Sequence, residues 1–338
     1  ILLHEGILGL HGKTGLAMLR YSEATVVAVI DRESAGKSLP ELTGIPCPVP
    51  IVASVAEALT HQVDVLVIGI AILGGELPPD WRQEIQTAIA AGVSIVNGLH
   101  TRLSDDPTWR ANLQPGQWIW DIRQEPPNLP VGTGQARSLP CLRVLTVGTD
   151  MGVGKMSTSL ELHRVSLERG LRSRFLGTGQ AGIMISGRGI PLDAIRVDFA
   201  AGAVEQLVME AATESDILHI EGQGSLHNPS STATLPLLRG SQPTHLVLVH
   251  RAGQSHIRRH PDIPIPPLKD VVRLYEAVAA AAGSFAAIKV AAIALNTAHM
   301  DAASAEYTIE QAQIQTGLPC TDPVRFGADL LLDAIVRQ

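Results

Sequence analysis

The chain has 338 residues, of which 45% are hydrophobic and 17% are charged, and its formal net charge is -7 at pH 7. This length is enough for two domains of ordinary size. The negative charge argues against nonspecific binding to nucleic acid or to an anionic membrane, because both need clustered positive charge. Three widely spaced cysteines without a CxxC pair indicate neither a disulfide framework nor a zinc site. The sequence favours a cytoplasmic protein with a small-molecule substrate and leaves homo-oligomer formation open.

The first part of the chain alternates short apolar runs with helical patterns, which is typical of a parallel sheet covered by helices. Six runs are expected to form strands, at residues 1–8, 25–31, 50–54, 64–70, 93–98 and 117–123. A segment rich in proline and glycine follows, and its composition indicates a linker. We therefore predict an α/β domain at 1–125, a linker at 126–142 and a second domain at 143–338.

Two loops of the first domain follow expected strands and carry polar residues. The segment "GLHGKTG" at 9–15 follows the first strand, and Asp31 ends the second, where an acidic residue holds a ribose in dinucleotide folds. The fingerprint GxGxxG is absent, so a turn with Lys13 near a helix N-terminus is favoured over a nicotinamide site. His100 lies in a later strand-end loop, where a substrate role and a role at a domain interface are equally compatible with the sequence.

The second part repeats the alternation of strands and helices. Five runs are expected to form strands, at residues 143–148, 173–179, 216–222, 244–250 and 289–296. Ligands of open parallel sheets bind at the carboxyl ends of the strands. The functional residues are therefore expected in the loops that follow these five runs.

A phosphate-binding loop is indicated at "VGTDMGVGKMSTSLEL", residues 147–162. Its glycines let backbone N–H groups turn inward, its lysine adds a positive charge, and the following helix offers its N-terminus to an anion. Five residues separate Gly148 from Gly154, one more than in the usual motif, and Met156 stands where a hydroxyl normally binds magnesium. Ser157 or Thr158 would supply that hydroxyl only in a shifted loop. The residues expected to bind a cofactor here are Gly148, Thr149, Asp150, Gly152, Val153, Gly154, Lys155, Met156, Ser157 and Thr158.

The loop resembles the variant motif "GTDTxVGKT" of dethiobiotin synthetase and related amide-forming ATPases. "HIEGQGS" at 219–225 is similar to that family's "EGAGG", and "ALNT" at 294–297 falls where its fold carries a base-recognising asparagine. Over the whole chain, the blocks "GTGQAGIMISGRGIP", "DFAAGAVEQLV", "EGQGSLHNP" and "IALNTAHM" resemble more closely a family formerly of unknown function and now associated with D-glutamate N-acetyltransferase. This resemblance implies an α/β protein with two parallel-sheet domains, a Rossmann-like one at 1–125 and a P-loop NTPase-like one at 143–338.

The same resemblance implies an N-acetyltransferase that moves acetyl from acetyl-CoA to the amine of D-glutamate or a related D-amino acid. The phosphate loop would then hold coenzyme phosphates without a catalytic metal, and Asn296 and Thr297 would face the adenine. Glu221 or His227 would act as the catalytic base, since acetyl transfer requires removal of a proton from the acceptor ammonium. A structural carboxylate and a hydrogen-bonded loop histidine are the alternative interpretations of these two residues.

Two further segments contain candidates for binding the acceptor. The glycine-rich stretch at 175–191 is expected to be a substrate loop, with a mobile connection as the alternative, and a basic cluster at 250–260 suits an anionic substrate. His256 and His260 have helical metal-ligand spacing, but nearby prolines break helices, so no metal site is expected. The substrate-binding candidates are Thr178, Gln180, Ser186, Arg188 and Arg251.

Two other functions remain open from the sequence. In an ATP- and magnesium-dependent ligase or kinase of the dethiobiotin synthetase type, Lys155 would contact the transferring phosphate, and Asp150 with Glu221 would hold the magnesium. In a non-catalytic, nucleotide-responsive module, the two domains would close around a ligand.

Overall fold

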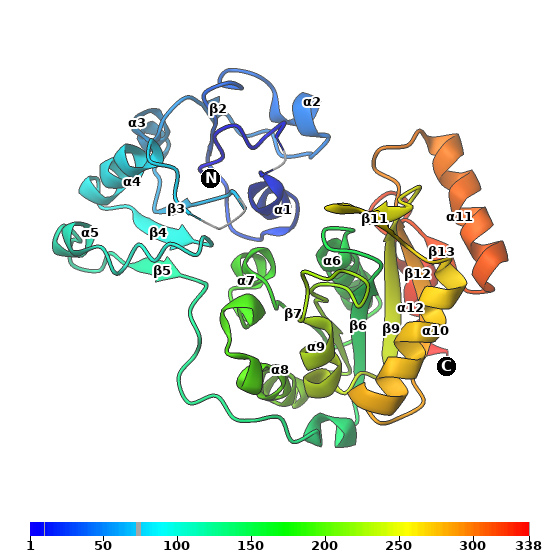
Figure 1. Ribbon diagram of the computed structural model, residues 1–338. Helices are drawn as coiled ribbons and strands as arrows, with labels where there is room; N and C mark the ends of the chain where they lie inside the picture. The colour runs from blue at the N-terminus through cyan, green and yellow to red at the C-terminus, as the bar shows by residue number, and fades with distance from the viewer. Residues whose placement is uncertain (10, 72–75, 338) are drawn as a thin grey trace. The chain divides into compact units, whose positions relative to one another are not determined.

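The computed structural model describes residues 1–9, 11–71 and 76–337, and the chain forms two compact units (Figure 1). The first unit comprises residues 1–124 and 183–187, and the second comprises 125–182 and 188–338. Residues 126–142, which we propose as a linker, group with the second unit. Leu10 of "GLHGKTG" and the last residue of the predicted second domain, Gln338, lie outside the described residues.

The first unit contains two small parallel sheets with helices between their strands. One sheet pairs β1 (Val29–Ile30) with β2 (Ile51–Val52), and the other has the order β3 (Val65–Val67), β4 (Ser94–Asn97), β5 (Ile119–Asp121). Five of the six expected strands are thus confirmed, each shorter than its apolar run. The helices are α1 (Lys13–Tyr21), α2 (Leu39–Thr43), α3 (Val55–Ala58), α4 (Trp81–Ala90) and α5 (Pro107–Ala111).

The strand expected at residues 1–8 is the exception, and this prediction was wrong. Only Leu2 takes part in β pairing, as isolated bridges to Ile30 and Ile68. The chain then turns, because the N–H of Gly6 bonds to the carbonyl of Leu3 at 2.8 Å and Glu5 adopts a φ of 59°. An extended strand cannot continue through such a turn.

The second unit is built on a six-stranded sheet of order β13-β12-β9-β6-β8-β7, in which the described pairs are all parallel. The five strands expected from the sequence are all present, as β6 (Leu142–Gly148), β7 (Ser173–Leu176), β8 (Ile217–Ile220), β9 (His245–Arg251) and β12 (Lys289–Asn296). The sequence did not predict three short strands, β10 (His256–Ile257), β11 (His260–Pro264) and β13 (Cys320–Thr321). Parallel sheets in both units confirm the predicted α/β fold class.

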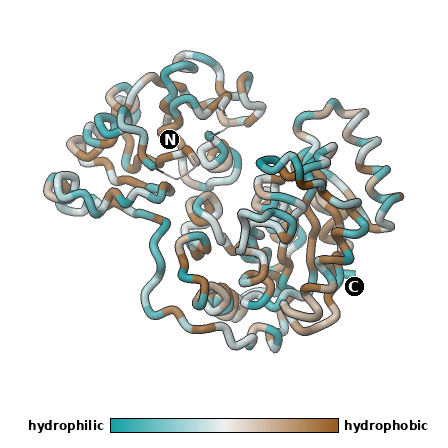
Figure 2. Tube along the Cα trace, in the orientation of Figure 1, coloured by the Kyte–Doolittle hydropathy of each residue, from teal (hydrophilic) through white to brown (hydrophobic). Residues whose placement is uncertain are grey.

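Helices cover both faces of this sheet, which explains why its strands are almost continuously apolar. Along β6, Val144 packs into one buried cluster while Leu145 and Val147 pack into the other. Figure 2 shows the resulting hydrophobic colour along the strands. Helices α6 (Lys155–Glu168) and α12 (Asp329–Val336) contact each other and line the cluster of Val144. The opposite cluster receives side chains from α8 (Val197–Ala212), α9 (Thr234–Ser241), α10 (Leu268–Val278) and α11 (Ala302–Thr316).

The glycine-rich stretch at 175–191 is only partly a loop, which corrects the prediction. Helix α7 (Gln180–Ser186) interrupts it. The helix forms because its apolar residues can be buried: Ile183 and Met184 join a cluster with Met18 and Val96 within the first unit. Among the described residues, no helix is long and apolar enough to span a membrane.

Candidate functional site

The loop between β6 and α6 has the backbone of a phosphate-binding loop. Gly152 and Gly154 have φ values of 68° and 116°, a region that side-chain-bearing residues rarely adopt. At Gly148, an added Cβ would lie 3.0 Å from the Lys155 Nζ atom. Helix α6 begins at Lys155 itself, so Met156 takes the second helical position and the loop is not shifted to bring Ser157 there. The glycines are therefore needed both for the turn and for the close approach of the lysine.

Lys155 is buried and folds back over its own loop, where Nζ donates a hydrogen bond to the Asp150 carbonyl at 2.8 Å. Its charge also acts on Glu221, whose pKa it lowers. The structure therefore brings together the phosphate loop and the end of β8, as the sequence predicted.

The carboxylate of Asp150 fastens two other loops to the phosphate loop. Oδ1 accepts hydrogen bonds from the N–H of Met151 and the amide of Asn228, and Oδ2 accepts from the amide of Gln254 and the N–H of Arg258, all at 2.7–2.8 Å. Burial alone would raise the pKa of Asp150, but these hydrogen bonds outweigh it and hold the pKa below its usual value. Both oxygens are thus occupied by protein donors.

Glu221 directly follows β8, and the residue is 4% exposed. Oε2 accepts hydrogen bonds from the N–H groups of Thr178 and Gly179 at 2.9 and 3.2 Å, and Oε1 accepts one from the Gln223 amide at 3.0 Å. Burial is the largest influence and raises the pKa of Glu221 from 4.5 to about 7, although the hydrogen bonds and Lys155 oppose it. This carboxyl is therefore poised to exchange a proton near neutral pH.

The stretch after β7 shapes the surroundings of Glu221. Thr178 is buried, and its hydroxyl donates to the Glu221 carbonyl at 2.7 Å. Gly182 lies so close to the carboxylate that an added Cβ would collide with Oε2. Gln180 is half-buried at the start of α7, and Arg188 is exposed. Ser186 belongs to the segment that groups with the first unit.

Burial disfavours the charged form of two histidines near this edge of the sheet. His227 is half-buried, burial lowers its pKa, and its Nδ1 atom is buried without a hydrogen-bond partner among the described residues. His250 bonds through Nδ1 to the Thr149 hydroxyl at 2.9 Å, and burial lowers its pKa to about 4. His250 therefore adds little positive charge to the predicted basic cluster. Arg251 ends β9, where it pairs in register with Asn296.

The end of β12, where the sequence predicts a base-binding site, lies beside the phosphate loop. Asn296 is half-buried beside the phosphate loop, and its amide donates to the Val153 carbonyl at 3.2 Å. Thr297 is fully buried, and its N–H and hydroxyl both donate to the Asp322 carboxylate, at 2.8 and 2.6 Å. The Thr297 hydroxyl thus fastens β12 to Asp322, and the expectation that Thr297 faces an adenine stays a prediction.

Comparison with known proteins identifies the family from both units. Residues 130–332 match a family model described as "Domain of unknown function (DUF1611_C) P-loop domain", and residues 32–125 match "Domain of unknown function (DUF1611_N) Rossmann-like domain". The chain belongs to the DUF1611 family.

Relatives and a solved structure agree with this DUF1611 assignment. Two proteins named D-glutamate N-acetyltransferase, from Tritonibacter scottomollicae and from a Pseudoalteromonas species, are each 36% identical, and each match covers 82% of this chain and 83% of the relative. The crystal structure of a DUF1611 family protein from Anabaena variabilis is 63% identical, with a TM-score of 0.97 over 100% of this chain and 98% of that one. The predicted family resemblance and the predicted pair of domains are both confirmed.

Several site residues of this DUF1611 protein were missed by the sequence analysis. Asn228 and Gln254 hold the Asp150 carboxylate, Gln223 holds Glu221, and Asp322 holds Thr297. All four lie in loops that follow strands, which is the one signal that pointed to them.

The candidates of the first unit have local structural roles or stay predictions. Asp31 is buried, and its Oδ1 atom accepts hydrogen bonds from the N–H groups of Glu5 and Glu33 at 3.3 and 3.2 Å, so it links the turn at Glu5 to the loop that follows β1. Lys13 begins α1, as the turn interpretation predicted. His100 is exposed, and neither of its two suggested roles is tested by these contacts.

Proposed function

We propose that this DUF1611 protein is an acetyl-CoA-dependent N-acetyltransferase whose acceptor is D-glutamate or a related D-amino acid. The observation that carries the proposal is Glu221, a buried carboxyl with a pKa of about 7 beside a phosphate-binding loop. It is supported by the two relatives of 36% identity that are named D-glutamate N-acetyltransferase.

In this reaction Glu221 would act as the base. A pKa of about 7 leaves roughly half of the carboxyl groups ionised at neutral pH, so the group can take a proton from the acceptor ammonium. The free amine then forms a C–N bond to the acetyl carbon, the C–S bond breaks, and the coenzyme leaves as a thiol once its sulfur is protonated. His227 is the second candidate for the base, because burial lowers its pKa and so favours the neutral imidazole that can accept a proton.

The phosphate loop is suited to binding the phosphates of the coenzyme. The positive φ angles of Gly152 and Gly154 let the loop backbone turn so that N–H groups can face an anion, Lys155 contributes a positive charge, and α6 offers its N-terminus. Because no phosphoryl group is transferred, no magnesium-binding hydroxyl is needed, which accounts for Met156. Asn296 would lie near the adenine. We propose that Thr178, Gln180, Arg188 and Arg251 of the second unit bind the acceptor carboxylates, while the substrate role of Ser186 stays a prediction from the sequence.

The ATP- and magnesium-dependent ligase is less well supported by the contacts of Asp150. That reaction would use the Asp150 carboxylate as a metal ligand, but each of its oxygens accepts two hydrogen bonds from neutral amide groups. Coordination would have to displace these donors. Acetyl transfer makes no such demand.

Activity measurements test the proposal directly. The protein is incubated with acetyl-CoA and a panel of D- and L-amino acids, and the release of free thiol is followed. We expect turnover with D-glutamate or a close D-amino acid. Hydrolysis of ATP that depends on magnesium, without thiol release, would instead identify the ligase. Stabilisation by nucleotide without any turnover would identify the non-catalytic module.

Thermal unfolding in excess chelator tests the proposed phosphate grip. We expect acetyl-CoA to raise the melting temperature without magnesium, since ligand binding to the folded state stabilises it. Lys155→Ala should abolish most of this shift, whereas the exposed Lys269→Ala serves as the matched control and should retain it. A shift that requires magnesium would contradict a metal-free grip.

A further inference from the structure

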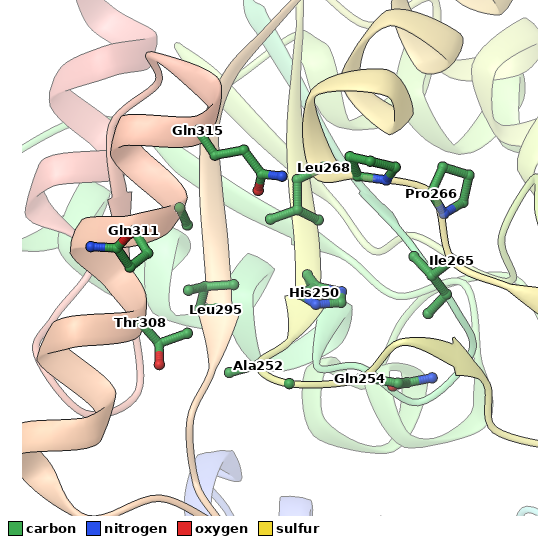
Figure 3. A pocket seen from close by; sticks show the side chains of 13 residues that line it. His250, Ala252, Gln254, Ile265, Pro266, Leu268, Leu295, Thr308, Gln311 and Gln315 are labelled. Atoms are coloured by element: carbon green, nitrogen blue, oxygen red, sulfur yellow. The ribbon is translucent and has the colours of Figure 1, made fainter.

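A cavity of about 360 Å³ lies at the carboxyl ends of β9 and β12, on the side of the sheet covered by α10 and α11 (Figure 3). Four segments line it: the end of β9 with its following loop, the residues that lead into α10, the end of β12 and one face of α11. None of the residues that we assign to the phosphates or to the acceptor is among its lining residues.

The two long walls of the cavity differ in chemistry. Thr308, Gln311 and Gln315 lie three and four residues apart on α11, so their side chains share one face of the helix. The opposite wall is apolar and includes Ile265 and Pro266. Figure 3 shows the two carboxamides across the cavity from the proline and the isoleucine. The cavity thus offers hydrogen-bond donors and acceptors along one edge and an apolar surface opposite.

Among the residues that the structure describes, no aspartate, glutamate, lysine or arginine lines the cavity. His250, the one ionisable residue among these lining residues, is neutral at physiological pH, because burial lowers its pKa to about 4. A charged ligand would lose its hydration without gaining a counter-charge. These walls therefore exclude a dicarboxylic amino acid and favour a neutral ligand.

We propose that this cavity binds a neutral purine ring. An apolar wall packs against the face of a flat ring, and the carboxamides of Gln311 and Gln315 present both donors and acceptors to its edge. The volume is at the lower end of the ~300–1,000 Å³ range of small-molecule sites, which suits a nucleoside rather than a whole coenzyme. The ring belongs either to a free nucleoside or to the coenzyme, and only the second source rests on the proposed acetyl transfer.

The cavity is also joined to the phosphate loop by two side chains of its lining. His250 bonds to Thr149 at 2.9 Å, and Gln254 donates to the Asp150 carboxylate at 2.7 Å. Two consecutive residues of the phosphate loop are therefore held by groups that a ligand in the cavity would contact. A purine bound here would lie next to bound phosphate, whichever of the two molecules supplies it.

Binding of adenosine, measured by calorimetry, tests the proposal without any acetyl transfer. Ala312→Leu should weaken binding strongly by filling the cavity, because Ala312 is a small, buried lining residue. The double variant Gln311→Ala/Gln315→Ala changes two exposed side chains, so the fold should be retained, and it should weaken binding about tenfold through the loss of two hydrogen bonds. Glu306→Ala, on the same helix but outside the lining, is the matched control.

Photolabelling with 8-azidoadenosine locates the site and distinguishes the two sources of the ring. We expect label on peptides from the segments that line the cavity, and none in Ala312→Leu. Loss of label in the presence of coenzyme A would show that the coenzyme's adenine occupies the cavity, whereas retained label would show a separate nucleoside site.

Either of these two results supports the purine site. Adenosine that does not bind, or label elsewhere, overturns it, even if acetyl transfer is observed. Binding without acetyl transfer would overturn only the proposed enzymatic function.

Discussion

Asp150 and Glu221 follow neighbouring strands of one sheet, and both are almost inaccessible to solvent, yet their surroundings shift their pKa values in opposite directions. Asp150 is 1% exposed and has a lowered pKa, whereas Glu221 is 4% exposed and has a pKa raised to about 7. Burial opposes ionisation of both groups. Four hydrogen bonds together outweigh it at Asp150, whereas three hydrogen bonds and the charge of Lys155 do not outweigh it at Glu221.

The comparison shows that a position at the end of a strand does not by itself determine what a carboxylate does. Each oxygen of Asp150 accepts two hydrogen bonds, so protonation would break contacts that hold two loops in place. The Oε1 atom of Glu221 accepts only one among the described residues, which leaves it able to carry a proton. Asp150 is therefore suited to holding the loops in place, and Glu221 is suited to proton transfer.

The largest effect expected from this difference concerns catalysis. Glu221→Gln should lower kcat by about 10²–10⁴-fold, the usual contribution of a general base. The dissociation constant of acetyl-CoA should change little, because the phosphate loop provides the grip. Glu205→Gln is a matched control: Glu205 is a buried carboxylate of the same unit that accepts the N–H of Thr133 and has a lowered pKa. Unchanged turnover of Glu221→Gln would transfer the role of base to His227.

The next effect concerns the pH dependence of stability. A carboxyl whose pKa is raised by folding binds its proton more tightly in the folded state, so its ionisation destabilises the fold. Relative to Glu221→Gln, the unfolding free energy of the wild type should fall as pH rises from 4.5 to about 7. The shift corresponds to roughly 3 kcal/mol at higher pH. Chemical denaturation of both proteins between pH 4 and 8 measures this difference, and parallel curves would refute the raised pKa.

The sequence predicted the part of this comparison that depends on backbone pattern. Continuous apolar runs located the five strands of the second unit, and glycine spacing located the phosphate loop with Lys155. Because parallel strands end at one edge of a sheet, Glu221 was correctly placed beside that loop. The prediction of a strand at residues 1–8 was wrong, because the turn after Leu3 lies inside an apolar run whose composition indicates an extended strand.

The partners of each carboxylate were not predictable from the sequence. Asp150 is held by Asn228 and Gln254, which lie 78 and 104 residues further along the chain. No local pattern links an aspartate to amides at such separations. The opposite pKa shifts follow from these long-range contacts, so they required the three-dimensional structure.

A smaller effect is expected at the supporting carboxylate. Asp150→Asn should lower the unfolding free energy by about 1–3 kcal/mol, because the amide nitrogen of asparagine faces donors that need an acceptor. Asp105→Asn, whose side chain is 62% exposed, is the surface control and should change stability little. Equilibrium denaturation at pH 7 measures both variants. An Asp150→Asn protein as stable as the wild type would show that its four hydrogen bonds do not secure the loops.

The smallest expected effect isolates the influence of Lys155 on the two carboxylates. Its charge lowers the pKa of Glu221, whereas at Asp150 its Nζ atom bonds the backbone carbonyl. Lys155→Met removes the charge but keeps a long side chain, so the pKa of Glu221 should rise further. A double-mutant cycle of Lys155→Met with Glu221→Gln, measured across pH, reports this coupling without relying on activity.

The pH range in which Glu221 affects stability should extend upward in the Lys155→Met background. The loss of unfolding free energy caused by Asp150→Asn should be the same in both backgrounds. An unchanged range would mean that the charge of Lys155 does not contribute to the pKa of Glu221, and a changed cost of Asp150→Asn would mean that the lysine supports both carboxylates.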